Sequence, residues 1–345
     1  MDSISQFALG AAIGEATLGT RLGKKAMLIG GLLATLPDLD VLVRYADAVE
    51  SYTYHRSWSH SLITLCLVSP FIAFLFHRYV PASWSLNARK TALQPESLTY
   101  PHWLLFVLLI LVTHPILDGF TVYGTQLFWP LPVEPIAWGS VFIIDPLYTL
   151  PLIICLLIAY RSRSRARSAA LIGLLLSTAY LAITLTSQQH ARMVALASLE
   201  EQNLSSAHVL VAPAPLSVLW RIVSMDGDTY YEGFYSLLDQ HKSISFAPYN
   251  SHRNIIDEQI DHWPIARLDW FTDGFISASR ENNQLIINDL RMGVEDSYVF
   301  RFRVGAWGDT GLQDGRSELL PMTMNIPRIT TIVKRAWDED INVTP

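Results

Sequence analysis

The sequence has little charge and few cysteines. Charged residues make up 16% of the 345 residues and hydrophobic residues 50%, which is too apolar for an ordinary soluble enzyme of this size. The two cysteines, Cys66 and Cys155, lie inside apolar runs, so we expect buried thiols and neither a disulfide nor a cysteine-based metal site. A net charge of −6 gives no support to nucleic-acid binding. Because no Gly-x-Ser-x-Gly motif is present, a serine hydrolase is not indicated.

Instead, the first half of the chain contains a series of apolar runs. Five runs carry almost no charge, and several approach the roughly 20 residues needed to cross a bilayer. They are residues 26–43, 62–76, 103–117, 141–160 and 169–186. The opening MDSISQFALGAAIGEATLGT lacks a basic start, so we expect no cleaved signal peptide but a helix rich in Gly and Ala that packs closely on its neighbours. The sequence thus predicts an α-helical integral membrane domain of five to six helices over residues 1–187.

Basic residues occur in three short segments between these runs. The clusters are Arg21, Lys24 and Lys25; Arg78, Arg89 and Lys90; and the RSRSRAR stretch at 161–167. Lys and Arg in short loops mark the cytoplasmic side of a membrane. If all three clusters are cytoplasmic, the loops 44–60 and 118–140 and the chain after residue 186 face outward. We therefore expect a multi-pass protein of a bacterial inner membrane with its C-terminal part outside.

With this topology, polar residues from separate segments meet at the outer face of the membrane. They are Asp38 and Asp40 in LPDLD, His55 and His60 in YHRSWSHS, His114 and Asp118 in THPILDG, and Asp145. His114 and Asp118 are four residues apart and share one helix face if the helix continues through Pro115. Ionisable groups beside hydrocarbon need partners, and the nearby arginines are too few to supply them. Imidazole and carboxylate together suit zinc, so we expect one divalent ion, or a pair bridged by Asp40 or Asp118.

Several of these residues also have purely structural explanations. An Asp after Pro is common in turns, and Asp145 before Pro146 is equally explained as the boundary between two elements. The aromatic residues of TVYGTQLFWP (121–130) line either a lipid-facing pocket or, more in keeping with their position, an interfacial belt. Two other functions stay open, which are an ion- or proton-coupled transporter and a non-catalytic, metal-stabilised membrane protein with a regulatory partner.

Four stretches together resemble the YdjM-like family of bacterial inner-membrane proteins. They are MDSISQFALGAAIGEATLG, LPDLDVL, HRSWSHS and THPILDG, and the resemblance covers roughly residues 1–190. It implies a membrane-embedded metal-dependent hydrolase, distantly similar to zinc-dependent phospholipase C, acting on a phosphate ester of a lipid or lipid-linked substrate. The implied ligands of the ion, expected to be Zn²⁺, are Asp38, Asp40, His55, His60, His114 and Asp118.

The resemblance also assigns further roles and has one departure. Asp40 and His60 are the expected catalytic residues, together with Arg56, which could pair with a phosphate. Relatives of this kind carry a His where this chain has Gln6, four residues before Gly10. Either the site has one ligand fewer or Asp2, one turn away, replaces it, with Asp145 as a further auxiliary residue. We interpret Glu15 as a helix-packing residue.

After residue 187 the composition changes to that of a soluble domain. Residues 188–202 have helical periodicity, and short β-branched and aromatic segments follow, separated by turn signals such as MDGD and RENNQ. We expect a β-rich domain of about six antiparallel strands over residues 188–345, outside the membrane. His241, His252 and His262 lack ligand spacing, so we interpret them as structural.

Overall fold

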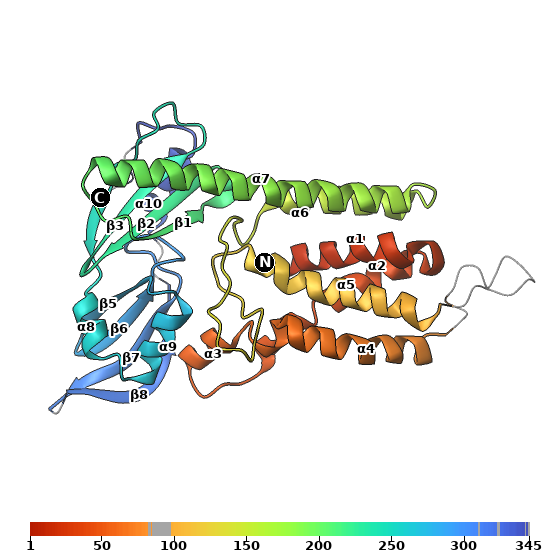
Figure 1. Cartoon of the computed structure of the whole chain (residues 1–345), viewed down its shortest axis with the longest axis horizontal. Helices are drawn as coiled ribbons and strands as arrows, with labels where there is room; N and C mark the ends of the chain where they lie inside the picture. Colours follow the sequence, from red (N-terminus) through yellow and green to blue (C-terminus); the bar gives the residue numbers. More distant parts are fainter. Residues whose placement is uncertain (82–83, 85–97, 310, 323–324, 342, 344–345) are drawn as a thin grey trace, which may run out of the picture.

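The helices of the first half lie side by side, and two β-sheets stand at one end of them (Figure 1). The computed structural model describes all residues except 82–83, 85–97, 310, 323–324, 342 and 344–345. The long helices are α1 (Ser3–Leu22), α2 (Lys24–Ala34), α4 (Leu62–Tyr79), α5 (Tyr100–Gly119), α6 (Pro146–Arg161) and α7 (Ala166–Glu201). The predicted fold class, a helical membrane half followed by a β-rich part, is confirmed.

Three helices in the described part of the chain are long and apolar enough to cross a membrane, namely α4, α5 and α7, and α6 is a shorter apolar helix. The predicted run 26–43 is not one helix. It forms α2, which ends at Ala34, and then a 3₁₀-helix, η1 (Pro37–Leu42). Pro37 has no N–H to continue the helical hydrogen-bond ladder, so the chain turns there and places Asp38 and Asp40 in a separate short helix at the end of α2.

Helices α1 and α2 form a close antiparallel pair. A Cβ added at Gly10 would overlap the carbonyl oxygen of Gly30, and one added at Gly14 would overlap that of Ala26. Small residues therefore let the two backbones touch, as predicted from the Gly- and Ala-rich opening. This contact fixes the amino-terminal turn of α1 beside the end of α2.

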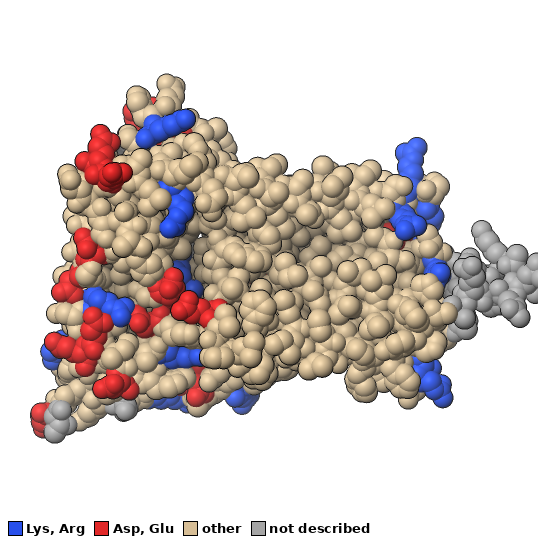
Figure 2. Space-filling model, in the orientation of Figure 1, with Lys and Arg blue, Asp and Glu red and all other residues tan. Residues whose placement is uncertain are grey.

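The basic clusters lie at the end of the helices opposite the sheets. Figure 2 shows Lys and Arg at that end, followed by a broad zone without charge and then the mixed charges of the C-terminal domain. The first and third clusters border the α1–α2 and α6–α7 turns, and Arg78 is in the last turn of α4. Arg89 and Lys90 lie outside the described residues.

The C-terminal domain contains two antiparallel four-stranded sheets among its described residues. One has the order β1 (His208–Pro213), β2 (Leu219–Asp226), β3 (Thr229–Ser236), β4 (Ala247–Asn250); the other has β5 (Ile276–Glu281), β6 (Gln284–Asp289), β7 (Arg301–Gly308), β8 (Gly311–Leu319). MDGD and RENNQ are the β2–β3 and β5–β6 turns, as predicted. The expected number of about six strands is too low, because β4 contains Pro248 and β8 is polar with two glycines.

Helix α7 joins the two halves without a break. The predicted domain boundary at 187/188 falls inside it, and the helix predicted at 188–202 is its last part. Ala191, Val194 and Leu199 of this part pack with Val209 and Trp220 of the first sheet. The first sheet is therefore held directly on the end of a bundle helix.

The second sheet is held by the loop between η1 and α4. This loop forms helix α3 (Ala48–Tyr54), whose Val49 and Tyr52 enter the core of the second sheet with Leu268 of α9 (Trp263–Phe271). The Tyr52 hydroxyl donates to Asp289 Oδ2 at 2.6 Å, and Arg291 pairs with the same carboxylate. The C-terminal domain thus fixes the position of α3, the helix that directly precedes His55 and His60.

Candidate metal centre

Four side chains from three segments converge at the sheet-side end of the helices. Asp38 comes from η1, His60 from η2 (Trp58–His60), and His114 and Asp118 from successive turns of α5. Each offers one ligand atom, and these atoms all lie within 4.8 Å of one another. His60, His114 and Asp118 are fully buried, whereas the side chain of Asp38 is 20% exposed. The predicted meeting of the three motifs is therefore present, with an opening on the Asp38 side.

The separations between the histidine nitrogens and the other ligand atoms are close to those of a tetrahedral zinc site. The two Nε2 atoms of His60 and His114 are 3.1 Å apart, and Asp118 Oδ2 lies 3.2 and 3.4 Å from them. Asp38 Oδ1 is 3.4 Å from each Nε2. Zinc–nitrogen and zinc–oxygen bonds of about 2.0–2.1 Å in tetrahedral geometry place ligands about 3.3–3.4 Å apart. The group therefore fits one small divalent ion.

Hydrogen bonds fix both imidazoles with their Nε2 lone pairs facing inward. His114 Nδ1 is 2.6 Å from the carbonyl oxygen of Ala34, which can only accept, so Nδ1 carries the proton. Ser59 Oγ donates to Asp40 Oδ2 at 2.6 Å and must therefore accept from His60 Nδ1 at 2.9 Å. Two lone pairs face each other at 3.1 Å, an arrangement that needs a metal ion or an added proton between them.

Asp118 has one oxygen held by the protein and one directed at the histidines. Its Oδ1 accepts from Gln6 Nε2 at 3.0 Å and contacts the amino group of Met1. Its Oδ2 is buried and has no hydrogen-bond partner among the described residues. A buried carboxylate oxygen without a donor is costly, and a cation would satisfy it.

Asp40 and His55, which the resemblance implies as ligands, lie beside this group and pair with each other. His55 Nδ1 is 2.8 Å from Asp40 Oδ1, and Asp40 Oδ2 accepts from the backbone N–H of Arg56 at 3.1 Å. Burial opposes the ionisation of Asp40, but the hydrogen bond and charge interaction with His55, the hydrogen bond from Ser59 and the nearby His60 together outweigh it, so the pKa of Asp40 is lowered. The carboxylate of Asp40 orients His60 through Ser59 and is not in the four-residue group.

Arg56 lies next to the group, as its predicted role requires. Its Nε is 3.5 Å from Asp118 Oδ2, and its Nη1 donates to Thr121 Oγ1 at 3.2 Å. The guanidinium lies 4.8 Å from the centre of the Tyr123 ring and is buried. No hydrogen-bond partner of its Nε is found among the described residues. A positive charge with a free donor therefore stands beside the ligand atoms.

Comparison with known proteins bears on the helical half. The model of the YdjM inner membrane protein family matches residues 1–191, which is more than half of the chain. The chain belongs to the YdjM inner membrane protein family. It is also 23% identical over 240 residues to the "Uncharacterized protein YfhP" of Bacillus subtilis (strain 168), covering 68% of each chain. No solved structure matches this YdjM-family protein. The family match includes all four residues of the candidate metal centre.

In this YdjM-family chain, the three auxiliary residues have structural partners. Gln6 does not join the ligand group, because its Nε2 donates to Asp118 Oδ1 and to the carbonyl oxygen of His114. Asp2 caps α1 by accepting from the N–H groups of Ile4 and Ser5 and so does not replace a ligand. Asp145 caps α6 and accepts from the hydroxyls of Tyr180 and Ser217.

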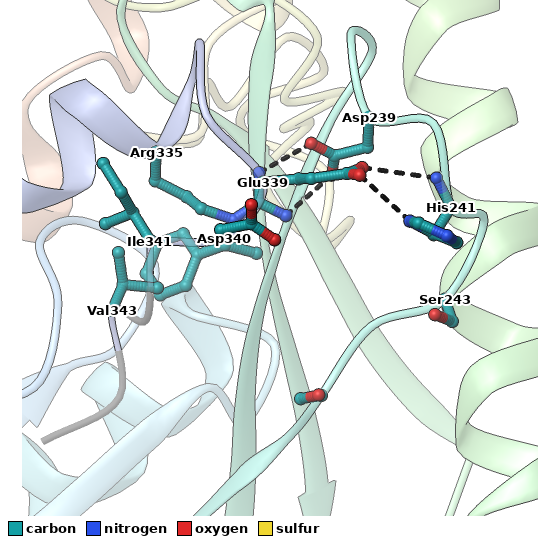
Figure 3. Close-up of a pocket in the computed structure, with 10 residues that line it drawn as sticks. Asp239, His241, Ser243, Arg335, Glu339, Asp340, Ile341 and Val343 are labelled. Carbon is teal, nitrogen blue, oxygen red and sulfur yellow. Dashed lines mark hydrogen bonds and ion pairs between the residues drawn. The ribbon is translucent and has the colours of Figure 1, made fainter.

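Glu15 and the histidines of the C-terminal domain also have structural environments. Glu15 Oε2 accepts from Arg163 Nη1 at 3.0 Å near the basic end of the helices. Figure 3 shows His241 beside Glu339, with Asp239 paired to Arg335 at 2.6 and 2.7 Å. Asp239 and Arg335 form a buried pair, while His241 is exposed and pairs with Glu339, which agrees with the structural interpretation of His241.

Some residues of the site could not be foreseen from the sequence. The carbonyl oxygen of Ala34 orients His114, and a backbone group carries no sequence signal. The loop that carries His55 and His60, called the histidine loop below, is fixed by a hydrogen bond between Tyr52 and Asp289, which are 237 positions apart in the sequence. In HRSWSHS, Ser59 orients His60 and Ser61 caps α4.

Proposed function

We propose that this protein is a membrane-bound, metal-dependent hydrolase of a phosphate ester carried by a lipid or lipid-linked molecule. The observation that carries the proposal is the group of Asp38, His60, His114 and Asp118, whose ligand atoms all lie within 4.8 Å of one another and whose imidazoles are both oriented for coordination. Mixed imidazole and carboxylate ligands are typical of zinc sites in hydrolases, whereas structural zinc sites usually contain cysteine.

The chain's own residues have distinct parts in this proposal. Asp38, His60, His114 and Asp118 would hold one divalent ion, most simply Zn²⁺, which would supply Lewis-acid polarisation and a more acidic water. Gln6 holds Asp118 in position through Oδ1. Asp40 fixes the ring of His60 through Ser59. Arg56 offers a buried positive charge for a phosphate beside the partly exposed Asp38.

The proposed location follows from the distribution of charge. The basic clusters are at one end of the helices and the C-terminal domain is at the other (Figure 2). The candidate metal centre lies at the end nearer the C-terminal domain. By the positive-inside rule, the basic end is cytoplasmic. The ester would then be hydrolysed at the outer face of the inner membrane.

One observation favours a second candidate, a metal-stabilised protein without catalysis. Four protein ligands already fill a tetrahedron, and a closed site of this kind is typical of structural zinc. Catalysis would require Asp38, the one partly exposed ligand, to yield or share its position. The two candidates agree on the ion and differ in what the ion does.

Metal analysis combined with an activity screen tests both candidates. Full-length protein purified in detergent is analysed for bound metals and screened with phosphomonoesters and phosphodiesters, beside His114→Ala and the control His241→Ala. The hydrolase predicts about one ion per chain, and loss of both metal and activity in His114→Ala only. Bound metal whose removal lowers the melting temperature, without any hydrolysis by wild type, supports the second candidate. Equal metal content in His114→Ala and wild type contradicts both.

A further inference from the structure

A pocket of about 430 Å³ lies between residues 40–55, which lead from η1 into the histidine loop, and the second sheet. One side is formed by η1 and α3, and the other by β7 and β8 of the C-terminal domain. Its lining is mostly apolar and includes Val41, Val43, Tyr52, Phe300, Phe302 and Leu319. The volume is within the range of about 300–1,000 Å³ usual for small-molecule sites.

The polar end of this pocket borders the candidate metal centre. Asp40 and His55 also line the pocket. The His55 ring is 5.8 Å from the His60 ring, centre to centre, and Asp40 is bonded to Ser59, which in turn contacts His60. A molecule in the pocket would therefore be separated from the metal ligand His60 only by the side chains of Asp40 and His55.

A positive charge stands at the same end. Tyr123 lines the pocket, and the Arg56 guanidinium lies against its ring at 4.8 Å. An anionic group attached to an apolar occupant would thus find Arg56 and the proposed ion close together. The lining is apolar along most of the pocket and polar at this end, where Asp40 and His55 line it and Arg56 lies behind the Tyr123 ring, so it suits an amphiphile whose head group is directed toward Arg56 and the proposed ion.

The far end of the pocket exposes apolar side chains. Val41 is 68% exposed and Leu319 is 51% exposed, and neighbouring Leu39 and Leu42 of η1 are also exposed. The helix α2, one of the apolar bundle helices, leads into η1. These exposed apolar residues directly follow the bundle helix α2 and include Val41 of the pocket lining, so they offer an apolar entry for a chain leaving a bilayer.

We infer that this pocket binds the apolar chain of an amphiphilic phosphate ester and that β7 and β8 are the substrate-selecting wall of the site. The inference rests on the proposed function for the reaction, but chain binding itself does not require catalysis. Phe300 and Leu319 contact the chain from the C-terminal domain, while Val41 and Tyr52 contact it from the membrane half. A soluble ester without such a chain would use the metal centre alone.

Leu319→Trp tests the pocket with little risk to folding, because Leu319 is 51% exposed on β8. Leu238→Trp is the matched control, since Leu238 is 56% exposed in the same domain and does not line the pocket. In detergent, we expect Leu319→Trp to lower kcat/KM for long-chain phosphatidic acid about tenfold, the loss of a few methylene contacts. The kcat/KM for a short chromogenic phosphate ester should stay within about twofold of wild type. Equal effects on both substrates, or none, would overturn the inference.

A binding measurement separates this inference from the proposed reaction. Full-length protein in phosphatidylcholine vesicles is photo-crosslinked with phosphatidic acid carrying a diazirine at the end of its acyl chain, and the adducts are mapped by mass spectrometry. We expect adducts on β7 and β8 in wild type and in His114→Ala. In Leu319→Trp, the yield of these adducts should fall at least about fivefold. If these adducts form and no ester is hydrolysed, the pocket stands and the hydrolase fails. Adducts confined to the sides of the bundle helices, or β7–β8 adducts unchanged in Leu319→Trp, overturn the pocket.

Discussion

Removing the hydroxyl of Tyr52 should loosen the histidine loop without touching the metal ligands. This hydroxyl donates to Asp289 Oδ2 at 2.6 Å and accepts from Arg291 Nη2 at 3.2 Å, and Asp289 and Arg291 are both buried. Burial raises the pKa of Tyr52 well above its usual value, with Asp289 adding to the effect, so the phenol remains a donor at neutral pH. Tyr52→Phe removes the short hydrogen bond to the Asp289 carboxylate, together with the longer one accepted from Arg291, and leaves the aromatic packing in place.

The expected cost follows from the charge of the acceptor. A hydrogen bond to a charged group is worth about 1.5–3 kcal/mol. Since 1.4 kcal/mol corresponds to a factor of ten, local opening of α3 should become about 10- to 150-fold more frequent. Global unfolding is a poor readout, because a protein with a membrane half and a separate β-rich domain need not unfold in one step. The effect should appear in the amides of α3 and of residues 55–60.

Hydrogen exchange measured by mass spectrometry on detergent-solubilised protein provides the assay. Tyr54→Phe is the control on the same helix, because Tyr54 uses its ring to stack on Tyr45 at 5.5 Å. Metal affinity should weaken in Tyr52→Phe and not in Tyr54→Phe, since His60 follows the loosened helix. Exchange in α3 unchanged by Tyr52→Phe, or raised equally by both substitutions, would refute the claim that the C-terminal domain holds this loop.

Three further outcomes are expected. Gln6→Ala should weaken metal binding by about 10- to 100-fold in a chelator competition, because Asp118 loses the donor that orients it; unchanged affinity would contradict this role. Asp145→Ala should cost about 0.5–2 kcal/mol as a lost helix cap, seen as a lower melting temperature with metal content unaltered. The pKa of Asp40 is lowered on folding, so the ionised Asp40 stabilises the folded protein above pH of about 4, and this stabilisation is lost as the pH falls through the folded-state pKa. Asp40→Asn should therefore be less stable than wild type at pH 7 and nearly equal to it in strong acid.

Residue type and helical spacing were enough to predict that the metal-centre segments meet. His114 and Asp118 share one face of α5 through Pro115, as their spacing of four requires. The sequence could not predict which acid of LPDLD turns inward. In a 3₁₀-helix of about three residues per turn, side chains two positions apart point about 120° away from each other. Asp38 therefore faces His60 and His114, while Asp40 faces His55, and both could not have joined one group.

The strands of the C-terminal domain were predictable only where they are apolar. The β2–β3 and β5–β6 hairpins have alternating β-branched and aromatic residues and clear turn residues. Strand β8 (GLQDGRSEL) has none of these properties and is recruited by pairing with β7. Its Leu319 nevertheless lines the pocket next to the metal centre. Part of the candidate substrate site is thus built by a strand that no local pattern indicates.

The similarity to YfhP extends beyond the helical half of the chain. The family match ends at residue 191, inside α7, and covers the four candidate ligands. The similarity to YfhP covers 68% of this chain, which is more than those 191 residues, so it extends past the helices. Two hydrogen bonds link the C-terminal domain to α3. Asp289 of β6 accepts from the Tyr52 hydroxyl, and Arg267 of α9 donates to Thr53 Oγ1. Directional hydrogen bonds to buried charges fix the position of α3, and with it the position of His55 and His60. A domain that merely lay over the membrane half would not need such bonds.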